Sequence, residues 1–371
     1  MEKSVKFKVG DWVEVRTQEE ILLTLDAKGQ LDGMPFMPEM FKFCGQKFPV
    51  YKSGHKSCDP DLFSRRIKDS VHVQARCDGS AHGGCQAGCL LTWKTAWLKP
   101  AQPNSASPFV QLANHAGNGR ASAASGCSES DVWANATSPD SKDQEPVYVC
   151  QTTQVPYAGE LLKWWDVRQY IEDFATGNVS LGRLLSGLFY WFYHALSEAG
   201  IGIGRPMRWL YDKAHSLSSG TEWPRKKGTI PSGAPTPAAA LNLQPGELVR
   251  VKSHKDILKT VNVESKNRGM FWDAELVPYC GGTYKVLDSV TKVIDEKSGK
   301  MVTMKTPAII LDSVICQARY SACRMFCPKS TWAYWREIWL ERITSVPDSA
   351  RASSSHEHAC NGSRKLVAER P

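Results

Sequence analysis

Two stretches of the chain alternate polar and apolar residues with a period of two, the pattern of a half-buried strand. They cover residues 10–15 and 246–251. In each copy a hydroxyl residue then stands three positions before an acid, Thr17 before Glu20 and Ser253 before Asp256, which predicts a capped short helix. Similar alternation or apolar runs predict further strands at 48–51, 71–76, 284–287 and 309–315. We therefore expect about five short strands in each copy.

The two copies belong to an internal repeat. Residues 10–50 align with 246–286 without a gap, at an offset of 236 positions. A Trp-x-x-x-Trp-Leu motif closes both copies, starting at Trp93 and at Trp335. We place the first repeat at 1–100 and the second at 244–345. The Trp side chains are expected to pack in the cores, in preference to stacking on nucleic-acid bases.

The opening Val9-Gly-Asp-Trp-Val-Glu-Val15 resembles the first strand of KOW-type and related SH3-like barrels. This resemblance implies a fold that is mainly β with a helical insert, built from two homologous SH3-like small β-barrels in tandem. Residues 76–89 and 335–339 also resemble an uncharacterised bacterial Cys-rich family, and this second resemblance implies no reaction.

The segments outside the repeats differ in composition. Residues 101–146 and 216–243 are rich in small residues, Pro and Gly, and are expected to be linkers, the first of them flexible. Residues 147–215 form a predicted helical insert, with helices at 160–174 and 180–199 and a run of aromatic residues at 189–193 expected to be buried between the barrels. The polar tail at 346–371 is expected to be disordered.

Composition and charge narrow the class of protein only slightly. The chain of 371 residues is 42% hydrophobic and carries a net charge of +8, which excludes collagen-like and wholly disordered chains. Nucleic acid is an allowed but not a favoured partner, and the substrate or protein partner stays unknown. The first ten residues lack the apolar core of a secretory signal, and no apolar run reaches the length of a transmembrane segment, so we expect a cytoplasmic protein. Motifs of the common nucleotide-binding, esterase and metalloprotease classes are absent.

The cysteines carry the candidate chemistry. In each repeat four of them recur at nearly the same spacing, and reduced compartments favour metal ligation over disulfides. The candidate metal ligands are Cys44, Cys77, Cys85 and Cys89 in the first repeat and Cys280, Cys316, Cys323 and Cys327 in the second. Four thiols suit tetrahedral zinc or an iron–sulfur cluster. Buried small side chains and disulfides are the other interpretations of the same pattern.

An iron–sulfur cluster in each repeat is the favoured interpretation, with Zn²⁺ as the alternative. Neither repeat has the C-x2-C knuckle that is common in zinc sites. Cys327-Pro328 is similar to the end of bacterial ferredoxin motifs, and the glycines between Cys77 and Cys89 allow a loop to wrap a cluster. These features predict a redox or sulfur-handling protein. A biosynthetic enzyme is one form that such a protein could take. The rival hypothesis is a zinc-stabilised module that binds nucleic acid or protein.

The two repeats are not identical around the cysteines. His82 stands between Cys77 and Cys85, and Tyr320 lies near the equivalent place in the second repeat. We expect His82 to lie behind the ligands or to be exposed to solvent, in preference to replacing a thiolate. Cys58 and Asp59 also lack counterparts, so any catalytic role is expected in the first repeat.

Overall fold

The computed structural model describes residues 6–61, 63–103, 126–139, 145–200, 202–217 and 221–343. The fold is mostly β, with added helices and a sheet that curves into half a barrel.

The strands are β1 (Trp12–Val15), β2 (Gln30–Leu31), β3 (Met34–Pro35), β4 (Lys47–Ser53), β5 (Lys56–Cys58), β6 (Ser64–Arg66), β7 (Ser70–Arg76), β8 (Leu90–Lys94), β9 (Leu98–Pro100), β10 (Glu160–Leu162), β11 (Leu248–Val251), β12 (Lys266–Asn267), β13 (Met270–Phe271), β14 (Thr283–Ile294), β15 (Met301–Ile315), β16 (Trp332–Trp335) and β17 (Leu340–Arg342). The α-helices are α1 (Gln18–Leu22), α2 (Glu129–Ala134), α3 (Gln151–Ala158), α4 (Arg168–Ala175), α5 (Leu181–Ser197), α6 (Gly204–Leu217) and α7 (His254–Leu258). The 3₁₀ turns are η1 (Pro38–Phe43), η2 (Thr95–Trp97), η3 (Ala274–Tyr279), η4 (Ala322–Arg324) and η5 (Glu337–Trp339).

Each repeat contains a five-stranded antiparallel sheet, and the two sheets have the same strand order. That order is β8-β7-β4-β1-β9 in the first repeat and β16-β15-β14-β11-β17 in the second. The register also repeats, because Val13 lies opposite Phe48 on β4 and Val249 lies opposite Tyr284 on β14. Val249 and Tyr284 each stand 236 positions after Val13 and Phe48, which is the offset of the sequence repeat. The period-two pattern therefore reports a shared sheet topology as well as a shared sequence.

The paired Trp motifs lie in the cores of the two sheets. All four of these side chains are fully buried, at 0% exposure: Trp93, Trp97, Trp335 and Trp339. The indole of Trp97 donates to the Thr24 hydroxyl at 3.1 Å, and the indole of Trp339 donates to the Thr260 hydroxyl at 2.9 Å. The expectation that these residues pack in the cores is confirmed. Each satisfied indole also fixes the orientation of the ring within its core.

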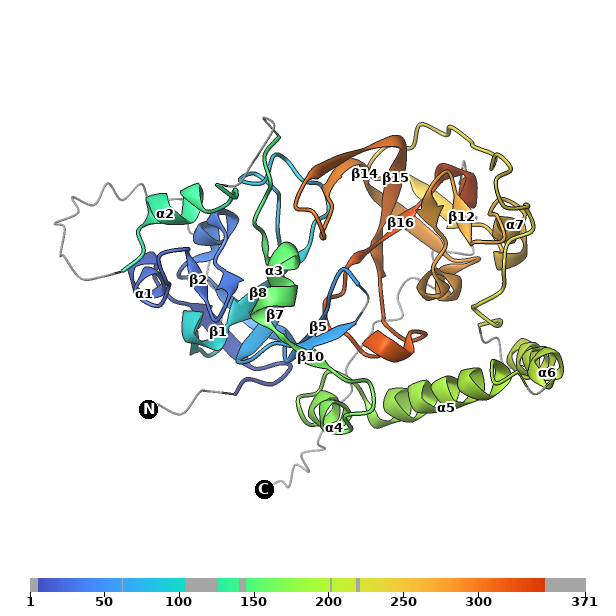
Figure 1. Cartoon of the computed structure of the whole chain (residues 1–371), viewed down its shortest axis with the longest axis horizontal. Helices are drawn as coiled ribbons and strands as arrows, with labels where there is room; N and C mark the ends of the chain where they lie inside the picture. Colours follow the sequence, from blue (N-terminus) through green and yellow to red (C-terminus); the bar gives the residue numbers. More distant parts are fainter. Residues whose placement is uncertain are drawn as a thin grey trace, which may run out of the picture.

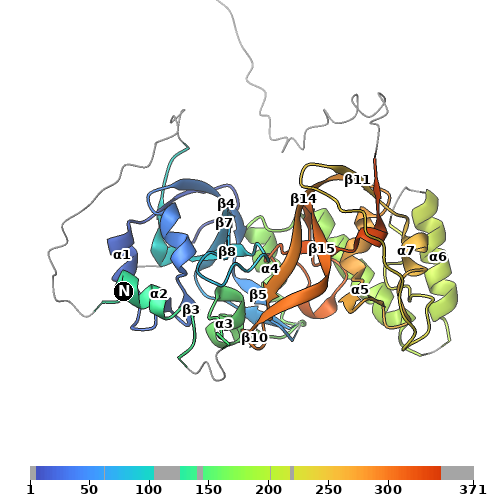
Figure 2. The ribbon, with the colours of Figure 1, turned by 90° about the horizontal axis from the view of Figure 1, so that it is seen from above.

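The connection between the second and third strands of each sheet reaches across to the other repeat. We call residues 54–69 the first arm, which carries β5 and β6, and residues 287–308 the second arm, which is the far part of the β14–β15 hairpin. The first arm touches the second repeat where Lys56 Nζ donates to the Met325 carbonyl at 2.9 Å. The second arm touches the first repeat where the Gln86 amide donates to the Lys292 carbonyl at 3.1 Å. In Figures 1 and 2, β5 and the β14–β15 hairpin accordingly lie between the two repeats.

Two of the expected segment assignments need correction. Part of the predicted flexible linker 101–146 forms α2, because Ser128 caps the helix and Val132 is buried against the first core. The predicted helix 160–174 begins instead as strand β10, which pairs with β6, and becomes helical only at α4. Residues 104–125 and 140–144 of that linker, and the predicted tail 346–371, lie outside the described residues.

The aromatic run on α5 is only half buried. Ser180 caps this helix as the sequence predicts, since its hydroxyl accepts from the Arg183 amide. Tyr190 is buried against the second repeat, but Phe189 and Phe192 are 62% and 61% exposed. The expectation that the whole run is buried between the repeats is therefore wrong. No helix within the described residues is long and apolar enough to cross a membrane.

Candidate functional site

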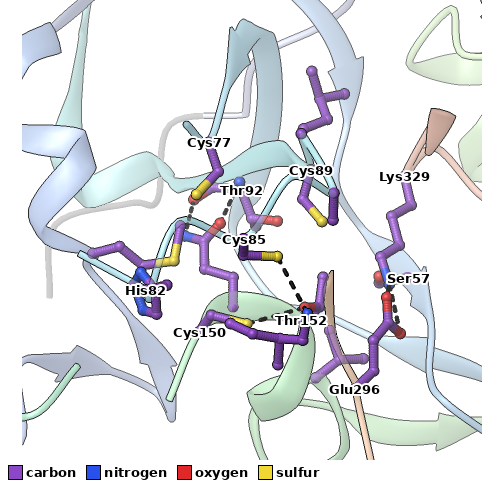
Figure 3. Close-up of a pocket in the computed structure, with 17 residues that line it drawn as sticks. Ser57, Cys77, His82, Cys85, Cys89, Thr92, Cys150, Thr152, Glu296 and Lys329 are labelled. Carbon is purple, nitrogen blue, oxygen red and sulfur yellow. Dashed lines mark hydrogen bonds and ion pairs between the residues drawn. The ribbon is translucent and has the colours of Figure 1, made fainter. Parts of the chain in front are cut away.

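A cavity of about 50 Å³ lies where the two repeats and the helical insert meet, with room for a few water molecules. Four thiols surround it, as Figure 3 shows. We call them the first thiol site: Cys77, Cys85, Cys89 and Cys150. Three of these residues are predicted ligands. The fourth predicted ligand of this repeat, Cys44, is not among the residues that line the cavity.

A single loop between β7 and β8 carries three of the thiols. Its ends are tied together because the Cys77 amide donates to the Cys89 carbonyl at 2.9 Å. Gly79 has φ +70°, and a Cβ at this position would lie 2.1 Å from the Cys85 carbonyl oxygen. Only glycine fits this turn. The loop therefore depends on its glycine to bring Cys85 back beside Cys77.

The buried carboxylate of Glu39 anchors the same loop by hydrogen bonds. It accepts from His82 Nδ1 at 2.7 Å and from the Ala81 amide at 3.0 Å. Burial raises the pKa of Glu39, but the hydrogen bond and charge of His82 outweigh it and keep the net pKa below its usual value. His82 Nε2 faces the Val149 carbonyl at 3.1 Å, so both ring nitrogens are engaged. His82 thus supports the loop, and neither of its nitrogens points freely to a ligand.

The second repeat uses the equivalent carboxylate in the same way. Glu275 accepts from the Arg319 amide at 2.9 Å and from the Tyr320 amide at 2.6 Å. It occupies the position of Glu39 at the repeat offset, and Tyr320 takes the place of His82. A buried acid that fixes the cysteine loop is therefore common to both repeats.

Cys150 enters the first thiol site from the insert. It is the N-cap of α3, and its sulfur lies 3.1 Å from the Thr152 hydroxyl. The next residue, Gln151, is buried and accepts from the Thr92 amide on β8 at 2.8 Å. This bond fixes the start of α3 on the first repeat. The repeated cysteine spacing does not select Cys150, because this residue has no counterpart in the second repeat.

The second arm closes the other side of the cavity. The Ile294 amide donates to Cys85 Sγ at 3.3 Å, and Lys292 Nζ donates to the Gly83 carbonyl at 2.9 Å. Glu296 and Lys329 form an ion pair at 2.9 Å beside the thiols. Lys329 is only 6% exposed. The first thiol site thus receives an amide donor and a buried cation from the second repeat.

Burial dominates the acid–base behaviour of these thiols. It raises the pKa of Cys77 well above its ordinary value and the pKa of Cys89 to about 12. Burial also raises the pKa of Cys85, and the neighbouring Cys150 adds to this effect. At neutral pH these three thiols therefore keep their protons, unless a bound metal cation displaces the protons.

Four more cysteines lie on the first arm and in the loop between β15 and β16, and we call them the second thiol group: Cys58, Cys316, Cys323 and Cys327. The Cys58 amide donates to Cys327 Sγ at 3.2 Å. The two thiols also share a hydrogen bond, which lowers the pKa of Cys58 and raises that of Cys327. Cys316 and Cys327 line a cavity of about 370 Å³.

The remaining predicted ligands lie elsewhere. Cys44 ends η1 and packs against the first hydrophobic core, and Cys280 ends η3 and packs against the second. Burial raises the pKa of Cys44 to about 11 and that of Cys280 to about 12. In the part of the chain that the structure describes, no three His, Cys, Asp or Glu side chains are already set to hold a metal ion. Each repeat thus brings three of its predicted ligands to the junction and leaves one in the core.

Comparisons with protein-family models, with curated proteins and with solved structures give no match for this chain.

Proposed function

We propose that the chain is a redox or sulfur-handling metal–thiolate protein, and that the first thiol site holds an iron–sulfur cluster. The observation that carries the proposal is the meeting of four half-buried thiols, from two segments far apart in the sequence, on one cavity. A four-cysteine set is the usual ligand set for such clusters. In this proposal Cys150 takes the role that spacing alone gives to Cys44.

The shape of the site favours a cluster over a single ion. A tetrahedral zinc ion needs four sulfurs that converge to about 2.3 Å from one point. The thiols of the first site instead stand around a cavity, so a group of several atoms suits them better. A bound cluster would supply one-electron chemistry at this position.

The surroundings would stabilise thiolates around such a group. The Gly79 amide lies 3.4 Å from Cys77 Sγ, and the Ile294 amide lies 3.3 Å from Cys85 Sγ. Hydrogen bonds to sulfur and net charge are among the factors that set the potential of a cluster. Lys329 adds a buried positive charge near Cys89. The chain thus offers both amide donors and a cation to four ligands that must each lose a proton.

The shared topology supports the interpretation of both repeats as SH3-like barrels. In each repeat the first strand pairs with the second and the last, and a 3₁₀ turn precedes the last strand. In this view the barrels are scaffolds, and the site lies in the loops and arms between them.

The proposal is tested by elemental analysis of protein that has been purified without oxygen. We expect iron and acid-labile sulfide, with visible absorption that bleaches on reduction. Cys150→Ser should lose the cluster of the first site, whereas the matched variant Cys44→Ser should keep it, because Cys150 lines the cavity and Cys44 does not. Circular dichroism should show that both variants fold.

Two results would overturn the proposal. One is zinc without sulfide, which would favour a structural role in a binding module. The other is a cluster that survives Cys150→Ser and is lost in Cys44→Ser, which would restore the ligand set that the sequence spacing predicts.

A further inference from the structure

The second thiol group is assembled from both repeats. Cys316, Cys323 and Cys327 lie in the loop between β15 and β16, and Cys58 ends β5 on the first arm. The Cys58 amide donates to Cys327 Sγ at 3.2 Å. Cys316 lines the same cavity as Cys327. The first arm therefore delivers one thiol to a loop that carries three.

Cys323 joins the group through the neighbouring strand. Ser64 on β6 lies directly opposite Cys58 in the β5–β6 ladder. Its hydroxyl donates to the Cys323 carbonyl at 2.9 Å. The backbone of Cys323 is thus held one strand away from Cys58. Its side chain is exposed.

Two cations lie near this group, each paired with a carboxylate, Lys329 with Glu296 and Arg324 with Asp273. Lys329 and Arg324 both lie within electrostatic reach of Cys58. Lys329 lines the cavity of the first thiol site and stands two residues after Cys327 in the chain, so it borders both sets of cysteines. Four thiolates around a metal carry a large negative charge, and these two cations would compensate part of it.

The two sets of cysteines follow one rule. In each repeat the three cysteines of the loop meet a fourth from outside the repeat, Cys150 in one case and Cys58 in the other. The remaining cysteine that the spacing suggests lies at the end of a 3₁₀ turn in both repeats, Cys44 after η1 and Cys280 after η3. The same outcome in two repeats is a stronger observation than either alone.

We propose that Cys58, Cys316, Cys323 and Cys327 form a second metal–thiolate site, which bridges the two repeats. The identity of its metal rests on the proposed function, but its ligand set does not. The bridge would join the first arm to the loop of the second repeat, so that loading the site holds the repeats together.

The test counts metal in full-length protein purified without oxygen. We expect two clusters in the unaltered chain, one in Cys58→Ser and two in the matched control Cys280→Ser. Cys323→Ser should also contain one, and because this side chain is exposed, its loss leaves the packing intact. The double variant Cys58→Ser, Cys150→Ser should contain none.

The outcomes separate this inference from the proposed function. If Cys150→Ser has no effect while Cys58→Ser halves the metal, the first site is wrong and the bridging site stands. If Cys58→Ser and Cys323→Ser both keep the full metal content, the bridging site is wrong. A Cys58–Cys327 disulfide in peptide maps of the anaerobic protein would also overturn it, because two of the ligands would then be consumed.

Discussion

A buried ion pair at the junction offers a quantitative test of how the repeats are joined. Lys56 and Asp173 are both 0% exposed, and Lys56 Nζ lies 2.6 Å from Asp173 Oδ2. Lys56 also donates to the Met325 carbonyl at 2.9 Å and to Gln169 Oε1 at 3.2 Å. His55 Nε2 lies 3.3 Å from the other carboxylate oxygen. This pair therefore connects the first arm, α4 and the cysteine loop of the second repeat.

Replacement of Asp173 by Asn leaves the Lys56 ammonium buried without its counter-charge. Breaking a buried pair in this way typically costs about 3–5 kcal/mol. Burial already lowers the pKa of Lys56, and the charge of Asp173 opposes that shift. The lysine can escape the penalty by losing its proton, which from its ordinary pKa costs about 5 kcal/mol at pH 7. Because the Met325 and Gln169 oxygens still accept hydrogen bonds, we expect a loss near 3 kcal/mol.

The assay is urea unfolding of the full chain, kept reduced and free of metal, and followed by tryptophan fluorescence. Asp173→Asn and Lys56→Met should each lower the free energy of unfolding, and the double variant should cost less than the sum of the two. Lys297→Gln is the control, since its ion pair with Asp61 is on the surface and should contribute little to stability. Single variants that lose less than about 1 kcal/mol, or fully additive losses, would refute the reasoning.

Three further predictions concern the loop, the pH dependence and the shared cation. Gly79→Ala should abolish the first site without removing a ligand, whereas Gly281→Ala, also at positive φ but with open space around it, should keep full metal content. Burial lowers the pKa of His72 from its usual value of 6.5 to about 4. Between these two pH values the imidazole is protonated in the unfolded chain and neutral in the folded chain, so the free energy of unfolding rises with pH in that window. Between pH 7 and pH 5 the unaltered chain should lose about 2 kcal/mol more than His72→Asn in urea unfolding. Lys329→Gln should make the clusters harder to reduce in a redox titration, because a buried positive charge is removed, and Lys297→Gln should not.

Each of these predictions has a clear contrary result. Equal metal loss in the two glycine variants would mean that general strain, and not the closeness of the Cys85 carbonyl, sets the outcome. Equal acid sensitivity in His72→Asn would show that this imidazole does not drive the pH dependence. Unchanged potentials in Lys329→Gln would place the cation too far from the clusters to matter.

Much of the fold could be predicted from the sequence because the repeat is local in character. The strand pattern at 10–15 and 246–251 and the Trp motifs depend on burial within one sheet, and both are visible as periodicity. The local sequence pattern does not predict β10, because the pairing of this strand is not local. Its pairing partner is β6, almost a hundred residues earlier in the chain, so its apolar residues were indistinguishable from one face of a helix.

The site shows the same limit more sharply. Spacing singles out the three loop cysteines of each repeat, because the loops themselves repeat. It also singles out Cys44 and Cys280, each of which ends a 3₁₀ turn. Cys58 and Cys150 could not be found this way, since an arm and an inserted helix bring them to the loops from outside. Repetition in the sequence reveals the residues that both repeats share. A residue that one segment supplies to the other repeat does not recur, so the repeat does not reveal it.

The most direct measurement is an anomalous-difference map from crystals grown without oxygen, recorded at the absorption edge of the metal found by elemental analysis. We predict two peaks per chain, one among the thiols of the first site and one among Cys58, Cys316, Cys323 and Cys327. Peaks beside Cys44 or Cys280, or thiol groups without any peak in protein that retains its native fold, would contradict the account.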